Sequence, residues 1–219
     1  MLAVYREDTA LPKQTFFNLP EEKRDTLIHA AKNEFSRVSL YEASIANIVK
    51  EADIPRGSFY QYFEDKDDLY FYLLDKQGEE LWKTLITNLK EHQGDLFESL
   101  LDLFHTILRM IDDEEARNFY RNVFLNMNYR TEKTFNQNVD YDKFLEKYTQ
   151  IKDLVLIDVL NIKDEEDLFH ILQMTTTIMF QNIILKFAHN LSNEEAYNNF
   201  DTQLTILKRG FLKLQEEVE

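Results

Sequence analysis

The sequence SIANIVKEADIPRGSFYQYFEDKDDL occupies residues 44–69 and has the signals of two short helices separated by a tight corner. Ser44 is a suitable N-cap for the first helix. Pro55 disfavours helical geometry at the residue before it, so this helix ends near Asp53, and a second helix runs to about Tyr62. The apolar residues of the first helix recur at the spacing that places them on one face: Ile45, Ile48, Val49 and Ala52.

The second helix has two chemically different faces when its residues are placed about 100° apart. One face is aromatic and is expected to pack on the preceding helices, whereas the other is small and polar. This separation is typical of a helix-turn-helix unit, whose second helix enters the major groove of DNA. The aromatic face holds Phe59, Tyr62 and Phe63, and the polar face holds Gly57, Tyr60 and Gln61, with Arg56 and Ser58 at its edges.

The polar face suits contacts with a DNA duplex. Arg56 can pair with guanine and Gln61 with adenine, while Gly57 lets the backbone approach closely. Hydroxyl groups and the free N–H groups of helix N-termini can hold phosphates. The expected DNA-binding residues are therefore Ser44, Arg56, Gly57, Ser58, Tyr60, Gln61 and Lys66.

The same part of the chain resembles the N-terminal domain of the TetR family of bacterial regulators. The resemblance covers about residues 20–75 and is most specific in GSFYQYF at 57–63, followed by Lys66 and Leu69; FFNLPEEKR at 16–24 adds to it. It implies a homodimer whose paired recognition helices bind a palindromic operator, most often as a repressor. It also implies a C-terminal helical domain that binds a small effector and releases the DNA, and it assigns the family's DNA contacts to the same seven positions.

Two positions depart from the family pattern. Asp53 stands where the family usually has glycine in the turn, and Asp tolerates left-handed geometry better than most residues. Ser39 and Leu40 stand where the family usually has glycine and an aromatic residue. Between Ala43 and Lys66 there are three basic and four acidic residues, so we expect few neutralised phosphates and a shallow salt dependence of DNA binding.

The composition predicts an all-helical fold. The chain has four Gly and three Pro, and every Pro lies at or before Pro55, so few helix breakers follow. We expect an N-terminal three-helix DNA-binding domain joined by a long helix to a C-terminal helical domain for ligand binding and dimerisation. The expected boundaries are 1–18 for a flexible arm, 19–66 and 67–219. The expected helices span about 20–38, 44–53, 55–62, 66–89, 96–111, 114–128, 138–160, 165–190 and 194–217.

Charge and composition also limit the function. The net charge of −15 has the wrong sign for a protein that coats nucleic acid nonspecifically, and most of the excess acid follows residue 70. No run of 18 apolar residues and no signal peptide are present, so we expect no membrane partner. The absence of Cys fits a reducing cytoplasm. Nothing in the sequence indicates a cofactor or a catalytic residue, and an enzyme is not expected.

The C-terminal part of the chain is rich in aromatic residues and Met, which are typical of a pocket for a small lipophilic effector or of an ordinary core. The expected pocket residues are Phe104, His105, Phe124, Tyr148, Phe169 and Met174. For any one of them, core packing is the competing interpretation, and His105 sits between leucines as a core histidine would. Another hypothesis keeps the same fold, but a protein partner controls DNA binding in place of a small effector, or the protein binds DNA constitutively.

An alternative from another class is a metal-dependent helical-bundle enzyme. The repeated pattern Asp-Leu-Phe-His places a carboxylate and an imidazole on one helix face at Asp102 and His105, and again at Asp167 and His170. Against this hypothesis, no bridging Glu can be identified.

Two apolar stripes near the C-terminus are expected to form the dimer interface, because the family pairs its last two helices across subunits. The expected interface residues are Ile178, Gln181, Leu185, Leu204, Leu207 and Phe211. The competing interpretation is that both stripes cover the core of a monomer.

Overall fold

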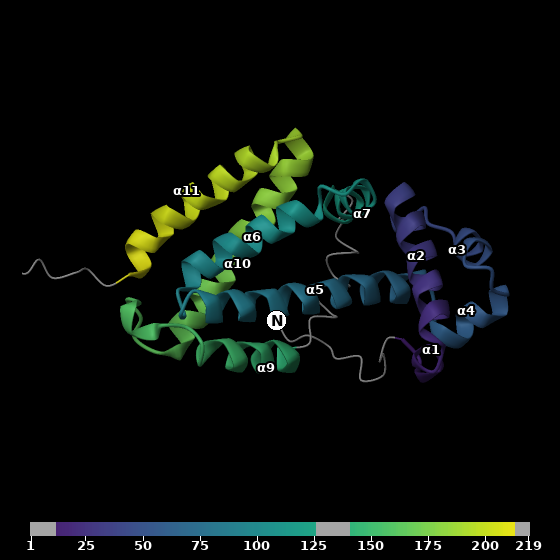
Figure 1. Ribbon diagram of the computed structural model, residues 1–219, viewed down its shortest axis with the longest axis horizontal. Coiled ribbons are helices and arrows are strands. Elements are labelled where there is room, and N and C mark those ends of the chain that lie inside the picture. The colour runs from purple at the N-terminus through teal and green to yellow at the C-terminus, as the bar shows by residue number, and fades with distance from the viewer. Residues whose placement is uncertain (1–11, 126–140, 213–219) are drawn as a thin grey trace, which may run out of the picture. The chain divides into compact units, whose positions relative to one another are not determined.

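The computed structural model describes residues 12–125 and 141–212, and its elements in these ranges are helices joined by loops and turns (Figure 1). The expected ends at 126–128, 138–140 and 213–217 lie outside the described residues. The elements are α1 (Gln14–Phe17), α2 (Glu21–Arg37), α3 (Ile45–Glu51), α4 (Arg56–Tyr62), α5 (Lys66–Glu91), α6 (Leu96–Met110), α7 (Glu114–Leu125), α9 (Tyr141–Lys152), the 3-10 turn Ile157–Val159, α10 (Glu165–His189) and α11 (Asn193–Phe211). The all-α prediction is confirmed.

The chain forms two compact units, and α5 runs from the first into the second. The first unit comprises residues 1–80 and 110–139, so it extends beyond the boundary expected at residue 66. The reason is that α7 packs along α2, while α3 packs on α2 and α4. The core of this unit is rich in aromatic rings, and its largest fully buried side chains are Phe16, Leu27, Phe35, Ile48, Phe59, Phe63 and Leu69.

The corner between α3 and α4 is closed by backbone hydrogen bonds. The amide of Ile54 donates to the carbonyl of Val49 at 3.0 Å, and the amide of Asp53 donates to that of Lys50 at 3.4 Å. This is the Schellman arrangement, which requires a left-handed residue just after the helix. Asp53 has a φ of 51° and fills that position. The turn expected from the sequence thus forms without glycine.

The N-terminal arm expected at 1–18 is not flexible in its described part. Residues 14–17 form α1, and Phe16 is 1% exposed. Its ring lies 5.0 Å from that of Phe63 and 5.4 Å from that of Tyr72, between centroids. Burial of one phenylalanine stabilises by about 1.5–3 kcal/mol, which holds the segment on the domain. Residues 1–11 lie outside the described residues.

The second unit comprises residues 81–109 and 140–219, and its core lies among α6, α10 and α11. The Ser192 hydroxyl accepts a hydrogen bond from the amide of Glu195, and the Glu195 carboxylate accepts one from the amide of Ser192, so α11 begins with a capping box. Asp164 caps α10 in the same sense, by accepting hydrogen bonds from the amides of Glu166 and Asp167. The rings of Phe104 and Phe200 meet at 4.5 Å between centroids.

The helix expected over 138–160 is shorter than expected. It ends at Lys152, and the chain turns through Ile157–Val159 instead. The amide of Leu156 donates to the carbonyl of Gly94 at 2.9 Å, and Gly94 has a φ of 90°. A Cβ at residue 94 would lie 2.7 Å from backbone atoms of this segment, so only glycine allows the close approach. The helix therefore ends because of a distant contact rather than a local breaker.

Among the described residues, one helix is long and apolar enough to cross a membrane by length and composition, Glu166–His189. It is most of α10, which packs on α11 and buries Leu168, Ile171 and Ile183. These are the contacts of a core helix within the second unit.

Candidate nucleic-acid interface

The two faces of α4 have very different exposure. Phe59 and Phe63 are 0% exposed and belong to the core of the first unit. Gly57 and Gln61 are exposed, and Tyr60 is 41% exposed. The aromatic face is thus directed inward and the polar face outward, as the helical wheel predicts. In Figure 1, α3 and α4 lie next to each other in the first unit.

The outward face of α4 presents an arginine beside a phenol. Arg56 is exposed, and its guanidinium donates to the hydroxyl of Tyr60 at 3.4 Å, one helical turn further on. Ser58 is partly exposed at the edge of the same face. A Cβ atom added at Gly57 would have no other atom within 4 Å, so there is open space around this position. The face can donate hydrogen bonds to base edges and phosphates.

The start of α3 is held by a buried carboxylate. Glu34 of α2 is 4% exposed and accepts hydrogen bonds from the amide of Ser44 at 2.8 Å and the side-chain amide of Asn47 at 3.1 Å. Arg37 pairs with the same carboxylate at 2.9 Å. Burial alone would raise the pKa of Glu34, but the hydrogen bonds from Ser44, Arg37 and Asn47 outweigh it and lower the pKa. The carboxylate therefore stays ionised at neutral pH.

Ser44 precedes α3 as expected, but its hydroxyl makes no capping hydrogen bond. Its amide is held by Glu34 instead, which leaves the hydroxyl available to another acceptor or donor. Lys66 is also in place at the start of α5, with its ammonium donating to the carbonyls of Tyr41 at 2.8 Å and Ala43 at 2.9 Å. In this structure, Lys66 fixes the loop that leads into α3.

Residues near α1 also position α4, and the sequence interpretation missed them. The amide of Lys13 donates to the carbonyl of Tyr62 at 2.8 Å, and its ammonium donates to the carbonyl of Tyr60 at 2.9 Å. The hydroxyl of Thr15 donates to the carbonyl of Gln61. These carbonyls belong to the last turn of α4, where backbone carbonyls have no hydrogen-bond donor within the helix. No local pattern in the sequence marks contacts between positions so far apart.

The chain resembles known families at both ends. Residues 27–73 match the description "Bacterial regulatory proteins, tetR family", and residues 95–211 match "Tetracyclin repressor-like, C-terminal domain". The second match alone spans more than half of the chain. This chain belongs to the TetR family. The family resemblance seen over about residues 20–75 is thereby confirmed, together with its architecture of a helix-turn-helix domain and a C-terminal helical domain.

Two relatives and one solved structure illustrate the match. The chain is 45% identical to the HTH-type transcriptional regulator HbdR of Aromatoleum sp. (strain CIB) over 56 residues, which are 26% of this chain and 24% of the relative. It is 25% identical to the HTH-type transcriptional regulator AcrR of Shigella flexneri over 133 residues, 60% of this chain and 62% of the relative. Each of these relatives is thus matched over less than two thirds of its length.

The solved structure is SmeT, the repressor of the Stenotrophomonas maltophilia multidrug efflux pump SmeDEF. It has a TM-score of 0.62 over 87% of this chain and 90% of that chain, with 14% identity. At this level of identity, the similarity shows the TetR fold alone.

The residues expected to line an effector pocket in this TetR protein are divided between the two compact units. Phe124 belongs to the first compact unit and the other five to the second. Within the second unit, Phe104 is 0% exposed against Phe200, whereas Met174 is 41% exposed. Tyr148 and Phe169 meet edge to face at 6.1 Å between ring centroids. The competing core interpretation therefore holds for Phe104.

His105 is not the core histidine considered above. It is exposed, its ring lies 6.0 Å from that of Tyr197, and it lines an open hollow of about 400 Å³ between α6 and α11. Leu108 of the same hollow is buried, but the imidazole is turned away from the core. The physical reason is that α6 buries the neighbouring Phe104 and Leu108 and leaves His105 on its outer side.

The two Asp-Leu-Phe-His sequences do not form a metal centre. Asp102 pairs with His92 at 2.6 Å rather than with His105, and Asp167 accepts a hydrogen bond from the amide of Lys163 at 2.8 Å. His170 lies 4.0 Å from Glu166. Within residues 12–125 and 141–212, no three His, Asp or Glu side chains are grouped as metal ligands. The alternative enzyme hypothesis therefore lacks the geometry that motivated it.

The two apolar stripes expected at the dimer interface, on α10 and α11, are partly buried within the monomer. Leu204 is 1% exposed, and Phe211 stacks on Phe97 at 6.4 Å between ring centroids. The expectation that Leu204 faces a partner is wrong, because α11 uses this side to cover the core of its own unit. Gln181 is exposed, and Ile178, Leu185 and Leu207 are partly exposed. The large apolar side chains that remain most exposed on α10 and α11 are Met174, Phe180 and Ile206.

Proposed function

We propose that this protein is a homodimeric transcriptional repressor that binds a palindromic operator through α3 and α4 and is released by a small-molecule effector. Membership in a family of bacterial regulators supports the regulatory role and a cytoplasmic location. The seven residues expected from the sequence are the proposed DNA contacts: Ser44, Arg56, Gly57, Ser58, Tyr60, Gln61 and Lys66.

The observation that carries this proposal is the orientation of α4. Its phenylalanines are fully buried, whereas Gly57, Tyr60 and Gln61 face outward. A helix that presents hydrogen-bonding side chains, together with a glycine at which the backbone can approach closely, suits the major groove. A recognition helix of seven residues buries too little surface alone for tight specific binding, which supports a dimer with two half-sites.

Selection of bound duplexes from random DNA tests the operator. We expect a symmetric consensus whose half-sites are centred about one helical turn of DNA apart or a multiple of it. Failure to enrich any symmetric duplex would contradict the proposal. Sedimentation tests the dimer: we expect about twice the chain mass of 26.3 kDa. A monomer at micromolar concentration would contradict this part.

The proposed dimer interface uses the exposed side of α10 and α11. Phe180 is 51% exposed and Ile206 is 59% exposed, and burial of such side chains favours association. Ile206→Glu therefore should convert the dimer to a monomer, whereas Leu204→Ala should mainly destabilise each monomer. For the effector, a screen of small molecules for release of operator DNA distinguishes a ligand-responsive repressor from one controlled by a protein partner or by none.

A further inference from the structure

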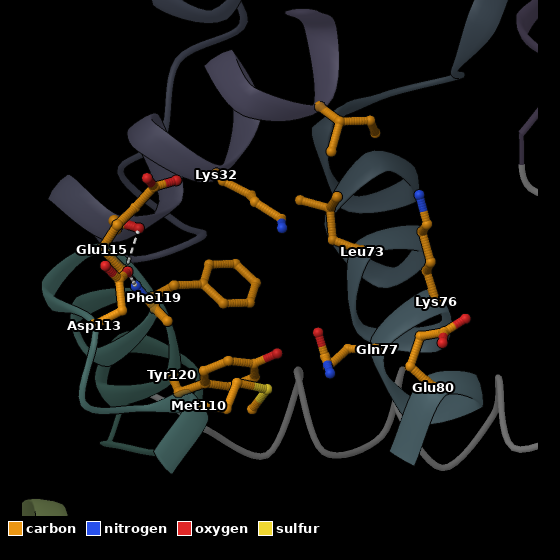
Figure 2. A pocket seen from close by; sticks show the side chains of 13 residues that line it. Lys32, Leu73, Lys76, Gln77, Glu80, Met110, Asp113, Glu115, Phe119 and Tyr120 are labelled. Carbon is orange, nitrogen blue, oxygen red and sulfur yellow. Dashed lines mark hydrogen bonds between the residues drawn. The ribbon is translucent and has the colours of Figure 1, made fainter. Parts of the chain in front are cut away.

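A pocket of about 280 Å³ lies within the first compact unit, among α2, α5 and α7 (Figure 2). It contains none of the residues expected to bind an effector. Its volume is near the lower end of those that hold small ligands. Apolar side chains from three segments form part of its wall: Leu73 of α5, Met110 at the end of α6 and Phe119 of α7.

Three polar side chains converge on this pocket from different helices. Figure 2 shows Lys32 of α2 reaching into the space, with Gln77 of α5 and the hydroxyl of Tyr120 of α7 below it. None of the three makes a hydrogen bond or an ion pair within residues 12–125 and 141–212. Burial raises the pKa of Tyr120, so its hydroxyl remains a hydrogen-bond donor at neutral pH. The pocket therefore offers an ammonium, an amide and a phenol to the same small volume.

Three acidic residues also line the pocket, and each of them already makes an interaction: Glu80, Asp113 and Glu115. Asp113 accepts a hydrogen bond from the amide of Ala116 at 3.0 Å and thus caps α7. The carboxylate of Glu115 lies 3.9 Å from the imidazole of His29. By contrast, Lys32 and Lys76 have no partner within the described part of the chain. The lining therefore holds two ammonium groups and three carboxylates, and only the ammonium groups lack a partner among the described residues.

We propose that this pocket binds a small molecule that combines a carboxylate with an aromatic or aliphatic body. The carboxylate pairs with Lys32 and accepts hydrogen bonds from Tyr120 and Gln77, which are the groups without partners. The apolar body lies against Leu73 and Phe119. A neutral or cationic molecule of the same shape leaves the ammonium of Lys32 without its partner and binds less well.

Occupation of this pocket acts on the helices that hold α3. Asn122 of α7 donates to the carbonyls of Phe35 and Ser36 at 2.9 Å, and the hydroxyl of Ser36 donates to the carbonyl of Glu115 at 3.1 Å. The same turn of α2 carries Glu34, which holds the start of α3. A ligand wedged between α2 and α7 strains this connection and lowers operator affinity; this regulatory step rests on the proposed function, whereas the binding site does not.

Methionine-methyl NMR of the full-length protein tests the site. The probes are 3-phenylpropionate, its uncharged amide 3-phenylpropanamide, and the cation 3-phenylpropylamine. Met110 lines the pocket, whereas Met174 and Met179 of α10 lie in the second unit and serve as internal references. We expect 3-phenylpropionate to shift the Met110 methyl signal saturably, with at least about fivefold tighter binding than the amide.

Single variants identify the groups that bind the probe. Lys32→Gln and Tyr120→Phe should each weaken 3-phenylpropionate binding several-fold, whereas Lys23→Gln, on an exposed site of α2, should leave it unchanged. Three results would overturn the proposal: no saturable Met110 shift in the millimolar range, equal binding of the three probes, or a shift confined to the methionines of α10.

Operator binding is measured separately with the selected duplex, with and without 3-phenylpropionate. We expect the probe to weaken operator binding by the wild type and to have no effect on Lys32→Gln at the same concentration. If the operator is bound but Met110 does not respond, the pocket proposal fails and the proposed function stands. If no operator is found, the proposed function fails, and the Met110 titration still decides the pocket.

Discussion

The carboxylate of Glu34, on α2, accepts a hydrogen bond of 2.8 Å from the backbone amide of Ser44, which directly precedes α3. This contact joins the first helix of the DNA-binding unit to the start of the next one. Because Glu34 is 4% exposed and also pairs with Arg37 and Asn47, it is the centre of a small buried network. The position of α3 therefore depends on one carboxylate.

Replacement of that carboxylate should loosen the helix-turn-helix unit. We expect Glu34→Ala to lower the free energy of unfolding by about 1–3 kcal/mol, because several donors lose their acceptor. Glu22→Ala, at an exposed site on the same helix, should change it by a few tenths of a kcal/mol. Chemical denaturation of both variants measures the difference. Equal stability of the two variants would show that the network contributes little.

The same network predicts a specific pH dependence. The pKa of Glu34 in the folded protein lies below its ordinary value of 4.5, so the ionised form is favoured by folding. The stabilisation is complete above pH 4.5 and is lost as the pH falls through the lower, folded-state pKa. Glu34→Gln cannot ionise, so the stability difference between wild type and this variant should shrink on acidification. Denaturation series at several pH values measure it; a constant difference would contradict the prediction.

The sequence predicts those features of the fold that are determined by residues close together in the chain, and not those that depend on contacts between distant residues. The corner at Asp53 and the two faces of α4 follow from residues that are neighbours in the chain, and both were predicted correctly. The end of α9 at Lys152 was not, because it is caused by the approach of Gly94. The order in α1 was missed because it depends on the burial of Phe16 against distant rings.

The same distinction applies to the sites. Most of the proposed DNA contacts lie within one short helix, so their periodicity is visible in the sequence. The pocket near Lys32 combines side chains from three helices, and no spacing connects Lys32, Gln77 and Tyr120. The sequence shows the apolar stripe on α11 through its helical spacing. The spacing does not show whether that stripe packs on a partner subunit or on the core of its own unit. Leu204 was therefore assigned to the wrong surface.

We expect Gly57 to lower the stability of the protein and to favour DNA binding. It lies inside α4 with no atom within 4 Å of a potential Cβ. We expect Gly57→Ala to raise the free energy of unfolding by about 1 kcal/mol, since alanine is the better helix former. If the backbone approaches DNA at this point, the same change should lower operator affinity roughly tenfold, or about 1.4 kcal/mol.

The matched control is Gly78→Ala in α5, where the space around a Cβ is equally open. It should raise stability to a similar extent and leave operator affinity unchanged. Thermal denaturation and operator titration of both variants make the comparison. Unchanged affinity in Gly57→Ala would remove the argument for close backbone approach at this residue.

The contacts from α1 to the end of α4 should matter for DNA binding without contributing specificity. Lys13 donates to the carbonyls of Tyr60 and Tyr62, so it holds the last turn of the recognition helix. We expect Lys13→Met to lower affinity about threefold to fivefold for operator and for single-base operator variants alike. Lys23→Met removes the same charge from an exposed site and should have a smaller effect. Equal losses in both variants would attribute the effect to charge alone.

Arg56 and Gln61 should instead control specificity. Both are exposed on α4, and the guanidinium of Arg56 makes only a long hydrogen bond, 3.4 Å, to the hydroxyl of Tyr60. Because base contacts specify whereas phosphate contacts position, Arg56→Ala or Gln61→Ala should each relax the preference at one position per half-site, at a cost of about 1–3 kcal/mol. Tyr60→Phe removes a hydroxyl expected to hold phosphate, so it should weaken all sequences equally. Repeating the duplex selection with each variant measures these preferences. A Gln61→Ala protein that retains the full wild-type consensus would mean that this side chain does not contact a base.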